Sequence, residues 1–217
     1  MAQHVDYAHS PVLHKGHYHP LSEVQEFRLV SSAFHPDGRI PRKFTQEGQG
    51  SQRDESPPLE WYGVPDGTES LALIMQDPDA PDPNAPIVPW VHWVLTNIPP
   101  TLKGIPANFT TKDMDPKNEY AEIQEGVNDW KLPGYRGPNP PVGVHCYEFR
   151  LYALDCKLKL GHKATKDKVL DAIEGHVLGE ALLIGHYGKD NFRRGRDSYV
   201  APSLPSASGP GTPFVGK

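Results

Sequence analysis

The chain has 217 residues, of which 24 are proline and 37% are apolar, and its net charge is −5. Proline interrupts helices and gathers in loops and at strand ends, so this composition favours short strands over a helical bundle. The acidic charge argues against nucleic-acid binding, which needs a basic surface, and no run of 18 apolar residues predicts a membrane-spanning helix.

The first part of the chain, residues 1–24, holds five of the eleven histidines and shows no apolar periodicity. Such a histidine-rich arm can bind metal, but no cysteine or carboxylate pattern in it indicates a fixed site. We therefore predict a flexible extension. The segment also lacks the apolar core of a secretory signal, so we expect a cytoplasmic protein.

A folded domain is predicted over residues 25–192. Apolar and polar residues alternate with the period of β-strands in segments 27–33, 70–77, 90–98, 144–154 and 180–187. One helix is predicted at about 165–178, with Thr165 as its N-cap and a core-facing stripe of Val169, Leu170, Ile173 and Val177. The pattern indicates an all-β, antiparallel domain with one or two peripheral helices. Residues 193–217 are rich in Pro, Ser and Gly and predict a flexible tail.

Four polar side chains lie on strand faces that are otherwise apolar: Asp77, His92, His145 and Tyr147. In segment 90–98, strict alternation puts Trp90, His92, Val94 and Ile98 on one face, and Val91, Trp93 and Leu95 on the other. A buried polar group needs a hydrogen-bond partner, so four of them near strand ends predict a shared polar pocket. Any one histidine taken alone is better explained as a satisfied core residue, and only the four groups together favour the pocket.

The loop 134–143, GYRGPNPPVG, directly precedes His145. Its glycines and prolines exclude a helix or a central strand and leave backbone N–H groups open. Such a loop can hold an anion with backbone donors, or it can simply turn the chain.

Several motifs of the chain resemble the phosphatidylethanolamine-binding protein family. They are DPDAP (77–81), Trp90-Val91-His92 and GPNPPVGVHCY (137–147). The flanking runs SPPLEW (56–61), EGVNDW (125–130) and FRLYALD (149–155) are similar to its bacterial-type branch, called YbhB-like or Raf-kinase-inhibitor-like. The resemblance covers nearly all of 25–192.

The resemblance implies a Greek-key β-sandwich of two antiparallel sheets, with a small pocket for phosphate-like or carboxylate anions. The ligand-binding residues that it implies are Asp77, Ala80, Pro81, Trp90, His92, Gly137, Pro138, His145 and Tyr147. It also implies a cis bond at Ala80–Pro81. The chain departs from the family at Cys146, where a basic residue is common, and at His186, where a small hydroxyl residue is more usual. Alternation points the Cys146 side chain away from the pocket.

The leading functional hypothesis is a binding protein for a small anionic ligand, such as phosphate or a phospholipid head group. It assigns no catalytic residue, no cofactor and no metal. An alternative is a small-molecule enzyme that uses Asp77 and the histidines as acid and base, or as an iron-binding triad. Against it, the sequence has no Gly-x-Ser-x-Gly elbow. A third alternative, implied by eukaryotic relatives, is a kinase- or protease-inhibitor-like regulatory protein with protein partners.

Overall fold

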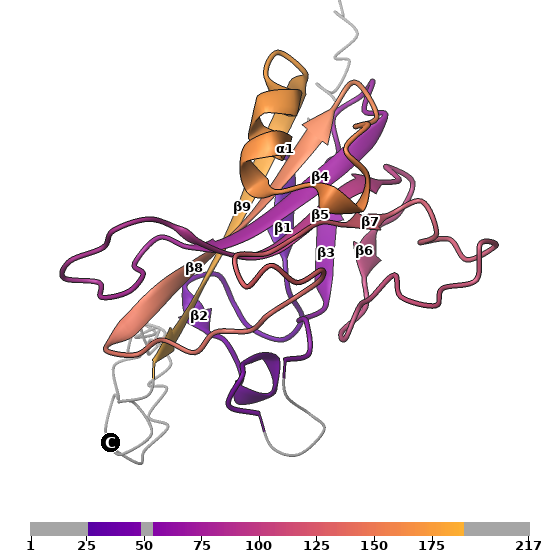
Figure 1. Ribbon diagram of the computed structural model, residues 1–217. Helices are drawn as coiled ribbons and strands as arrows, with labels where there is room; N and C mark the ends of the chain where they lie inside the picture. The colour runs from indigo at the N-terminus through magenta and orange to yellow at the C-terminus, as the bar shows by residue number, and fades with distance from the viewer. Residues whose placement is uncertain (1–25, 49–53, 189–217) are drawn as a thin grey trace, which may run out of the picture.

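The computed structural model describes residues 26–48 and 54–188 (Figure 1), so the predicted extensions at 1–24 and 193–217 lie outside the described residues. The described chain forms two sheets. The small sheet has the order β1-β3-β6, with bounds Arg28–Val30, Leu59–Tyr62 and Gly104–Ile105. The large sheet has the order β2-β9-β8-β4-β5-β7, with bounds Gly38–Arg39, Val177–Gly188, Val144–Leu154, Ser70–Asp77, Trp90–Ile98 and Gln124–Glu125.

The all-β prediction is confirmed, with one correction to the strand directions. Every neighbouring pair is antiparallel except β2 and β9, which run parallel through Gly38 and Arg39. Two short 3₁₀ turns, Arg42–Phe44 and Gly161–Lys163, and one α-helix, α1 (Lys166–Ile173), complete the described elements. Among the described residues, no helix has the length and apolar character needed to cross a membrane.

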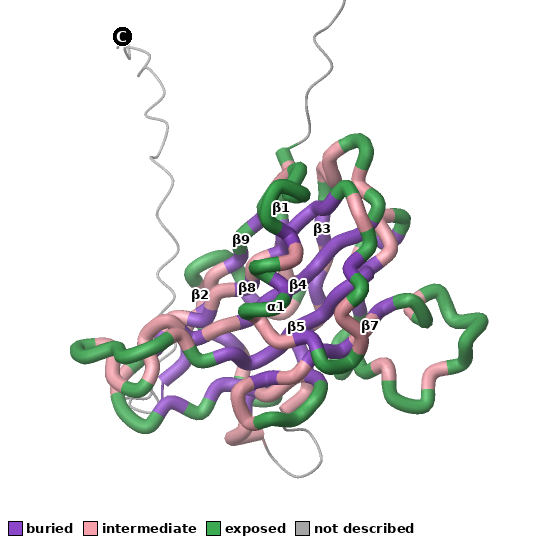
Figure 2. Tube along the Cα trace, turned by 45° about the horizontal axis from the view of Figure 1, so that its top comes forward, coloured by how far each residue is buried: buried purple, intermediate pink, exposed green. Residues whose placement is uncertain are grey.

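The main core lies between the two sheets. It joins Trp61 of β3 to Leu73 of β4, Trp93 of β5 and Phe149 of β8, all of them buried. The indole N–H of Trp61 donates to the Leu102 carbonyl at 2.8 Å, which satisfies its polar atom inside this core. Figure 2 shows the strands as the buried centre of the molecule, with the exposed residues concentrated in the loops.

Helix α1 covers the outer face of the large sheet, where its Val169 and Ile173 share a second buried cluster with Ala72 and Ile74 of β4 and Val91 and Val94 of β5. Thr165 caps the helix as predicted, since its hydroxyl accepts from the Lys168 N–H at 3.5 Å.

The predicted extent of this helix is wrong at its end. The helix stops at Ile173, and Gly175 adopts φ +78°, a left-handed conformation that suits glycine and turns the chain. Val177 therefore begins β9 and is 43% exposed, and Leu170 is also exposed. Of the predicted apolar stripe, only Val169 and Ile173 are buried.

The predicted bounds of β4, β5 and β8 agree with the structure, whereas β1 is shorter and β9 longer than predicted. Strand β5 is irregular: Met75 pairs with Trp93 but Gln76 pairs with Val91, so His92 is an extra residue, a β-bulge. The bulge shifts the alternation of the strand. The predicted faces are therefore wrong beyond His92, as shown by Trp93 and Leu95 in the core between the sheets and by Val94 under α1 with Val91. A second shift in register, between the pairs Leu71–Ile98 and Leu73–Leu95, returns Ile98 to the core between the sheets.

Candidate ligand-binding site

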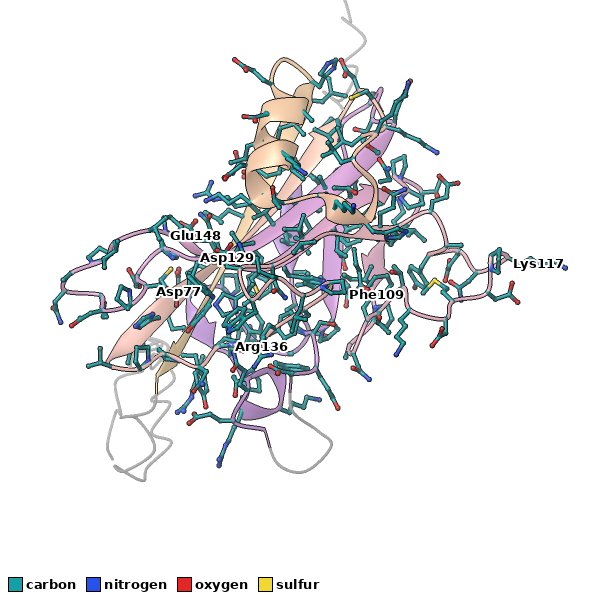
Figure 3. All side chains as sticks on the ribbon, in the orientation of Figure 1. Asp77, Phe109, Lys117, Asp129, Arg136 and Glu148 are labelled. Atoms are coloured by element: carbon teal, nitrogen blue, oxygen red, sulfur yellow. The ribbon has the colours of Figure 1, made fainter. Side chains whose placement is uncertain are left out.

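Three adjacent strands of the large sheet bring the predicted polar residues together. Asp77 ends β4 and pairs with Trp90, the first residue of β5, while Gln76 pairs with Glu148 of β8. The start of β8 therefore lies beside Asp77. Figure 3 shows Asp77 in the same part of the molecule as Glu148 and Arg136.

The strand ends and their loops enclose a cavity of about 340 Å³. Its lining comprises Asp77, Ala80, Pro81, Ile87, Val88, Trp90, His92, Trp130, Asn139, Pro140, Pro141, His145 and Tyr147. The loop that follows β4 is closed by the Ile87 N–H, which donates to the Ala80 carbonyl at 3.0 Å. The Ala80–Pro81 bond in this loop is cis, which confirms the prediction.

Asp77 and His145 form a buried pair at the floor of the cavity. The Nδ1 atom of His145 lies 2.7 Å from Oδ2 of Asp77, and its Nε2 lies 3.0 Å from the carbonyl oxygen of Val142. The other Asp77 oxygen accepts from the Asp79 N–H at 2.9 Å. Burial raises the pKa of Asp77, and the hydrogen bond from His145 opposes that shift.

The hydrogen bonds of this pair fix its total charge. Because Val142 offers only a carbonyl, Nε2 of His145 must carry a hydrogen. One further proton lies between Nδ1 and Asp77, bound to one or the other. In either arrangement the pair is neutral overall, so it supplies no net positive charge to a ligand.

His92, the extra residue of the β5 bulge, is held in one tautomer. Its Nδ1 lies 2.5 Å from the carbonyl oxygen of Arg136, and a carbonyl can only accept, so Nδ1–H is the donor. Burial lowers the pKa of His92 to about 4, which makes the ring neutral near pH 7. Nε2 is then a hydrogen-bond acceptor on a residue that lines the cavity. The ring packs edge-on against Trp130 and Tyr147, at centroid distances of 5.0 and 5.3 Å.

The Tyr147 side chain is fully buried, and its hydroxyl makes no hydrogen bond of standard geometry among the described residues, although the Asp77 carboxyl lies close enough to act on it. Burial, followed by the nearby Asp77 carboxyl, raises the pKa of Tyr147 far above its usual value, so the group stays protonated. A buried hydroxyl without a partner costs about 1–3 kcal/mol. Because Tyr147 lines the cavity, a ligand that reaches this hydroxyl would supply the acceptor that it lacks.

Most of the remaining lining is apolar. Trp90 and Trp130 meet edge to face at a centroid distance of 5.5 Å, and Ile87 and Val88 flank them. Ile87 is 81% exposed, which places it at the mouth of the cavity. Among the described lining residues there is no lysine or arginine. The guanidinium of Arg136 lies over Trp130 instead, 5.2 Å from its ring centroid.

Seven of the nine predicted site residues line the cavity: Asp77, Ala80, Pro81, Trp90, His92, His145 and Tyr147. Gly137 and Pro138 do not. The Gly137 N–H donates to Asp54 at 2.8 Å, and the Pro138 carbonyl accepts from the Gln46 N–H at 3.1 Å. A Cβ atom at Gly137 would come within 2.6 Å of the Phe44 carbonyl oxygen. These two residues therefore fix the loop against residues 44–46 and Asp54, and the residues that follow them, 139–141, line the cavity.

Sequence reasoning missed Ile87, Val88, Trp130 and the run 139–141. The signal for Trp130 and for 139–141 was present, because they lie inside the motifs EGVNDW and GPNPP. Cys146 is not among the lining residues. Burial, with nearby carboxylates, raises the pKa of its thiol to about 11, so it is a poor nucleophile. Among the described residues, only Asp155, Cys156 and His176 bring three metal-ligating atoms together, which does not favour an iron triad at Asp77.

Comparison with known proteins supplies the family. The model of the family described as Phosphatidylethanolamine-binding protein matches residues 30–188. The chain belongs to the phosphatidylethanolamine-binding protein family.

Several family members resemble this chain along its folded part. A UPF0098 protein of Methanothermobacter thermautotrophicus is 49% identical over 159 residues, which is 73% of this chain and 97% of that protein. A homolog of known structure from Chlamydia trachomatis has a TM-score of 0.65 and 34% identity, and the match covers 76% of this chain and 98% of that one. YbcL of E. coli, described as a new member of the mammalian PEBP family, has a TM-score of 0.64 and 27% identity, and the match covers 76% of this chain and 99% of that one.

Proposed function

We propose that this protein binds a small ligand that places a phosphate-type head group between Nε2 of His92 and the Tyr147 hydroxyl, beside the Asp77–His145 pair that lines the same cavity. The apolar part of the ligand would lie against Trp90 and Trp130. The observation that carries the proposal is the pairing of a donor without a hydrogen bond of standard geometry, the Tyr147 hydroxyl, with an acceptor, Nε2 of neutral His92, on the lining of one cavity.

The head group must match both atoms. A hydrogenphosphate monoester does so, since its P–OH donates to Nε2 of His92 while another oxygen accepts from the Tyr147 hydroxyl. A fully ionised phosphate offers only acceptors and would face Nε2 without a hydrogen. The neutral Asp77–His145 pair adds no compensating charge. The singly charged, protonated form is therefore the proposed ligand species.

The apolar lining supports an alkyl or similar group next to the phosphate. Trp90, Trp130 and Val88 offer hydrocarbon surface beside the polar floor, and each buried methylene contributes up to about 0.8 kcal/mol. Among phospholipids, phosphatidic acid has a phosphate monoester of this type, whereas the phosphodiester of phosphatidylethanolamine, after which the family is named, has no P–OH group to donate to Nε2 of His92. The enzyme alternative has less support, because both ring nitrogens of His145 are already engaged with Asp77 and Val142.

Calorimetric titration with hexyl phosphate tests the proposal. We expect saturable binding to the wild type and an affinity about 10- to 100-fold lower for Tyr147→Phe and His92→Ala, the range for one lost hydrogen bond to a charged group. Tyr62→Phe is the matched control, because that tyrosine lies on β3 and bonds only to Glu60 among the partners described.

A second ligand tests the protonation state. Hexyl methyl phosphate carries one negative charge but no P–OH group, so it should bind at least tenfold more weakly than hexyl phosphate. Equal affinity of wild type, Tyr147→Phe and His92→Ala for hexyl phosphate would refute the proposal. Equal affinity of the two ligands would refute the role of Nε2 as an acceptor.

A further inference from the structure

A second group of reactive side chains lies away from the cavity, where β8 ends and β9 begins. Asp155 and Cys156 directly follow β8, and His176 directly precedes β9. One ligand atom from each of the three residues lies within 4.8 Å of the other two. Within the group, Nδ1 of His176 is 2.7 Å from Oδ1 of Asp155.

Backbone hydrogen bonds hold the two segments in place. The Asp155 N–H donates to the His176 carbonyl at 3.1 Å, and the His176 N–H donates to the Ile173 carbonyl at 2.9 Å. The Ser70 hydroxyl on β4 donates to the Cys156 carbonyl at 2.5 Å. The main chain around all three side chains is therefore fixed by the sheet and by the end of α1, so an ion needs to reorient only side chains.

We propose that Asp155, Cys156 and His176 form a binding site for a divalent transition-metal ion of the zinc type. A thiol sulfur, an imidazole nitrogen and a carboxylate oxygen are ligands of Zn²⁺ and Co²⁺, whereas Mg²⁺ and Ca²⁺ require oxygen ligands. With bonds of about 2.0–2.3 Å, tetrahedral ligand atoms lie roughly 3.3–3.8 Å apart. Side-chain rotations that move the ligand atoms by roughly 1–1.5 Å would bring them from separations of up to 4.8 Å to this tetrahedral spacing.

The exposure of the group suits an open site. The side chains of His176 and Asp155 are 48% and 46% exposed, which leaves room for water as the fourth ligand. Cys156 packs against the core beneath α1 and would bind the ion from its protein side.

The charges also balance. Binding releases the thiol proton of Cys156 to solvent, and the hydrogen on Nδ1 of His176 moves to Nε2, so the ring stays neutral. One thiolate and one carboxylate then neutralise the two positive charges of the ion.

Cobalt spectroscopy tests the site on the full chain, prepared without a histidine tag and with reduced cysteines. Co²⁺ bound by a thiolate gives a sulfur-to-metal charge-transfer band in the near ultraviolet, and tetrahedral coordination gives intense visible absorption. We expect both in the wild type at one ion per chain, and we expect Zn²⁺ to displace them. The histidine-rich segment 1–24 contains no cysteine, so it has no thiolate that could produce the charge-transfer band.

The second cysteine gives a matched control. Cys146 lies near the other end of β8, roughly 30 Å away at about 3.3 Å per residue. We expect Cys146→Ser to keep the band and Cys156→Ser to lose it, with both variants folded by circular dichroism. His176→Ala, with both cysteines intact, should weaken the apparent Co²⁺ affinity at least tenfold.

Three results would overturn the proposal. They are a wild-type chain without a charge-transfer band at millimolar Co²⁺, a band that persists in Cys156→Ser, and a band that depends on Cys146. If Cys156→Ser does not fold, the His176→Ala and Asp155→Asn variants test the site instead. A Co²⁺ titration midpoint that is unchanged from wild type in both variants would refute the proposal.

Discussion

Replacing Tyr147 with phenylalanine should separate the stability of the protein from its ligand affinity. The Tyr147 ring is fully buried, but its hydroxyl makes no hydrogen bond of standard geometry among the described residues. Removing that oxygen keeps the packing and relieves an unsatisfied donor. We expect the free energy of unfolding to stay unchanged or to rise by about 1 kcal/mol, which corresponds to a Tm increase of up to roughly 4 °C. Affinity for hexyl phosphate should fall by about 10- to 100-fold.

Tyr135→Phe is the matched comparison. The Tyr135 hydroxyl donates to the Phe44 carbonyl at 2.6 Å, so its removal leaves that carbonyl without this bond. We expect a loss of about 1 kcal/mol in stability, measured by urea unfolding, and little change in affinity. If Tyr147→Phe instead costs as much stability as Tyr135→Phe and binds ligand normally, Tyr147 has a partner within the protein and the reasoning fails.

Three further perturbations follow from other parts of the structure. Acidification from pH 7 to 4 should cost about 3 kcal/mol through His92, because its pKa is about 4 in the folded protein against 6.5 unfolded, so the unfolded state takes up the proton first. Urea titrations across this range should show a flatter dependence in His92→Gln; an identical slope would contradict the neutral ring. Gly137→Ala should destabilise the fold by about 1–3 kcal/mol in thermal unfolding, since its Cβ would lie 2.6 Å from the Phe44 carbonyl and 2.7 Å from Cα of Thr45. The affinity of the folded Gly137→Ala protein for hexyl phosphate should change less than twofold. A loss of affinity without a loss of stability would show that Gly137 contacts the ligand. Each methylene added to an alkyl phosphate should improve wild-type affinity up to about fourfold until the cavity is full, and Trp130→Ala should reduce this gain. An unchanged chain-length dependence would place the alkyl group elsewhere.

The strands that build the site were predictable because their alternation is long and bounded by turn residues. The limits of β4, β5 and β8 follow from the sequence alone. The end of the helix did not, since Val177 continues the helical spacing while Gly175 has already turned the chain. The positive φ of Gly175 therefore ends the helical segment, although the apolar spacing continues beyond it.

The bulge at His92 was hidden for a different reason. Both faces of β5 are buried, one between the sheets and the other under α1. Apolar residues are therefore expected on both faces, and the sequence pattern does not reveal an extra residue. Only the pairing with β4 fixes the register. Sequence reasoning did not place Trp130 in the cavity lining because this residue lies in a loop, where no periodicity relates a side chain to the strands that it contacts.

The bond between Nδ1 of His92 and the Arg136 carbonyl has a consequence for selectivity among oxyanions. Sulfate and hydrogenphosphate have nearly the same size and shape, but sulfate carries no hydrogen at neutral pH. A ring whose remaining nitrogen, Nε2, can only accept should therefore reject sulfate, and we expect millimolar sulfate not to compete with hexyl phosphate. Competition at equal strength would show that the ring gains a proton on binding. Because the carbonyl belongs to the main chain, no substitution of the Arg136 side chain removes it, and this discrimination should survive mutation at that position.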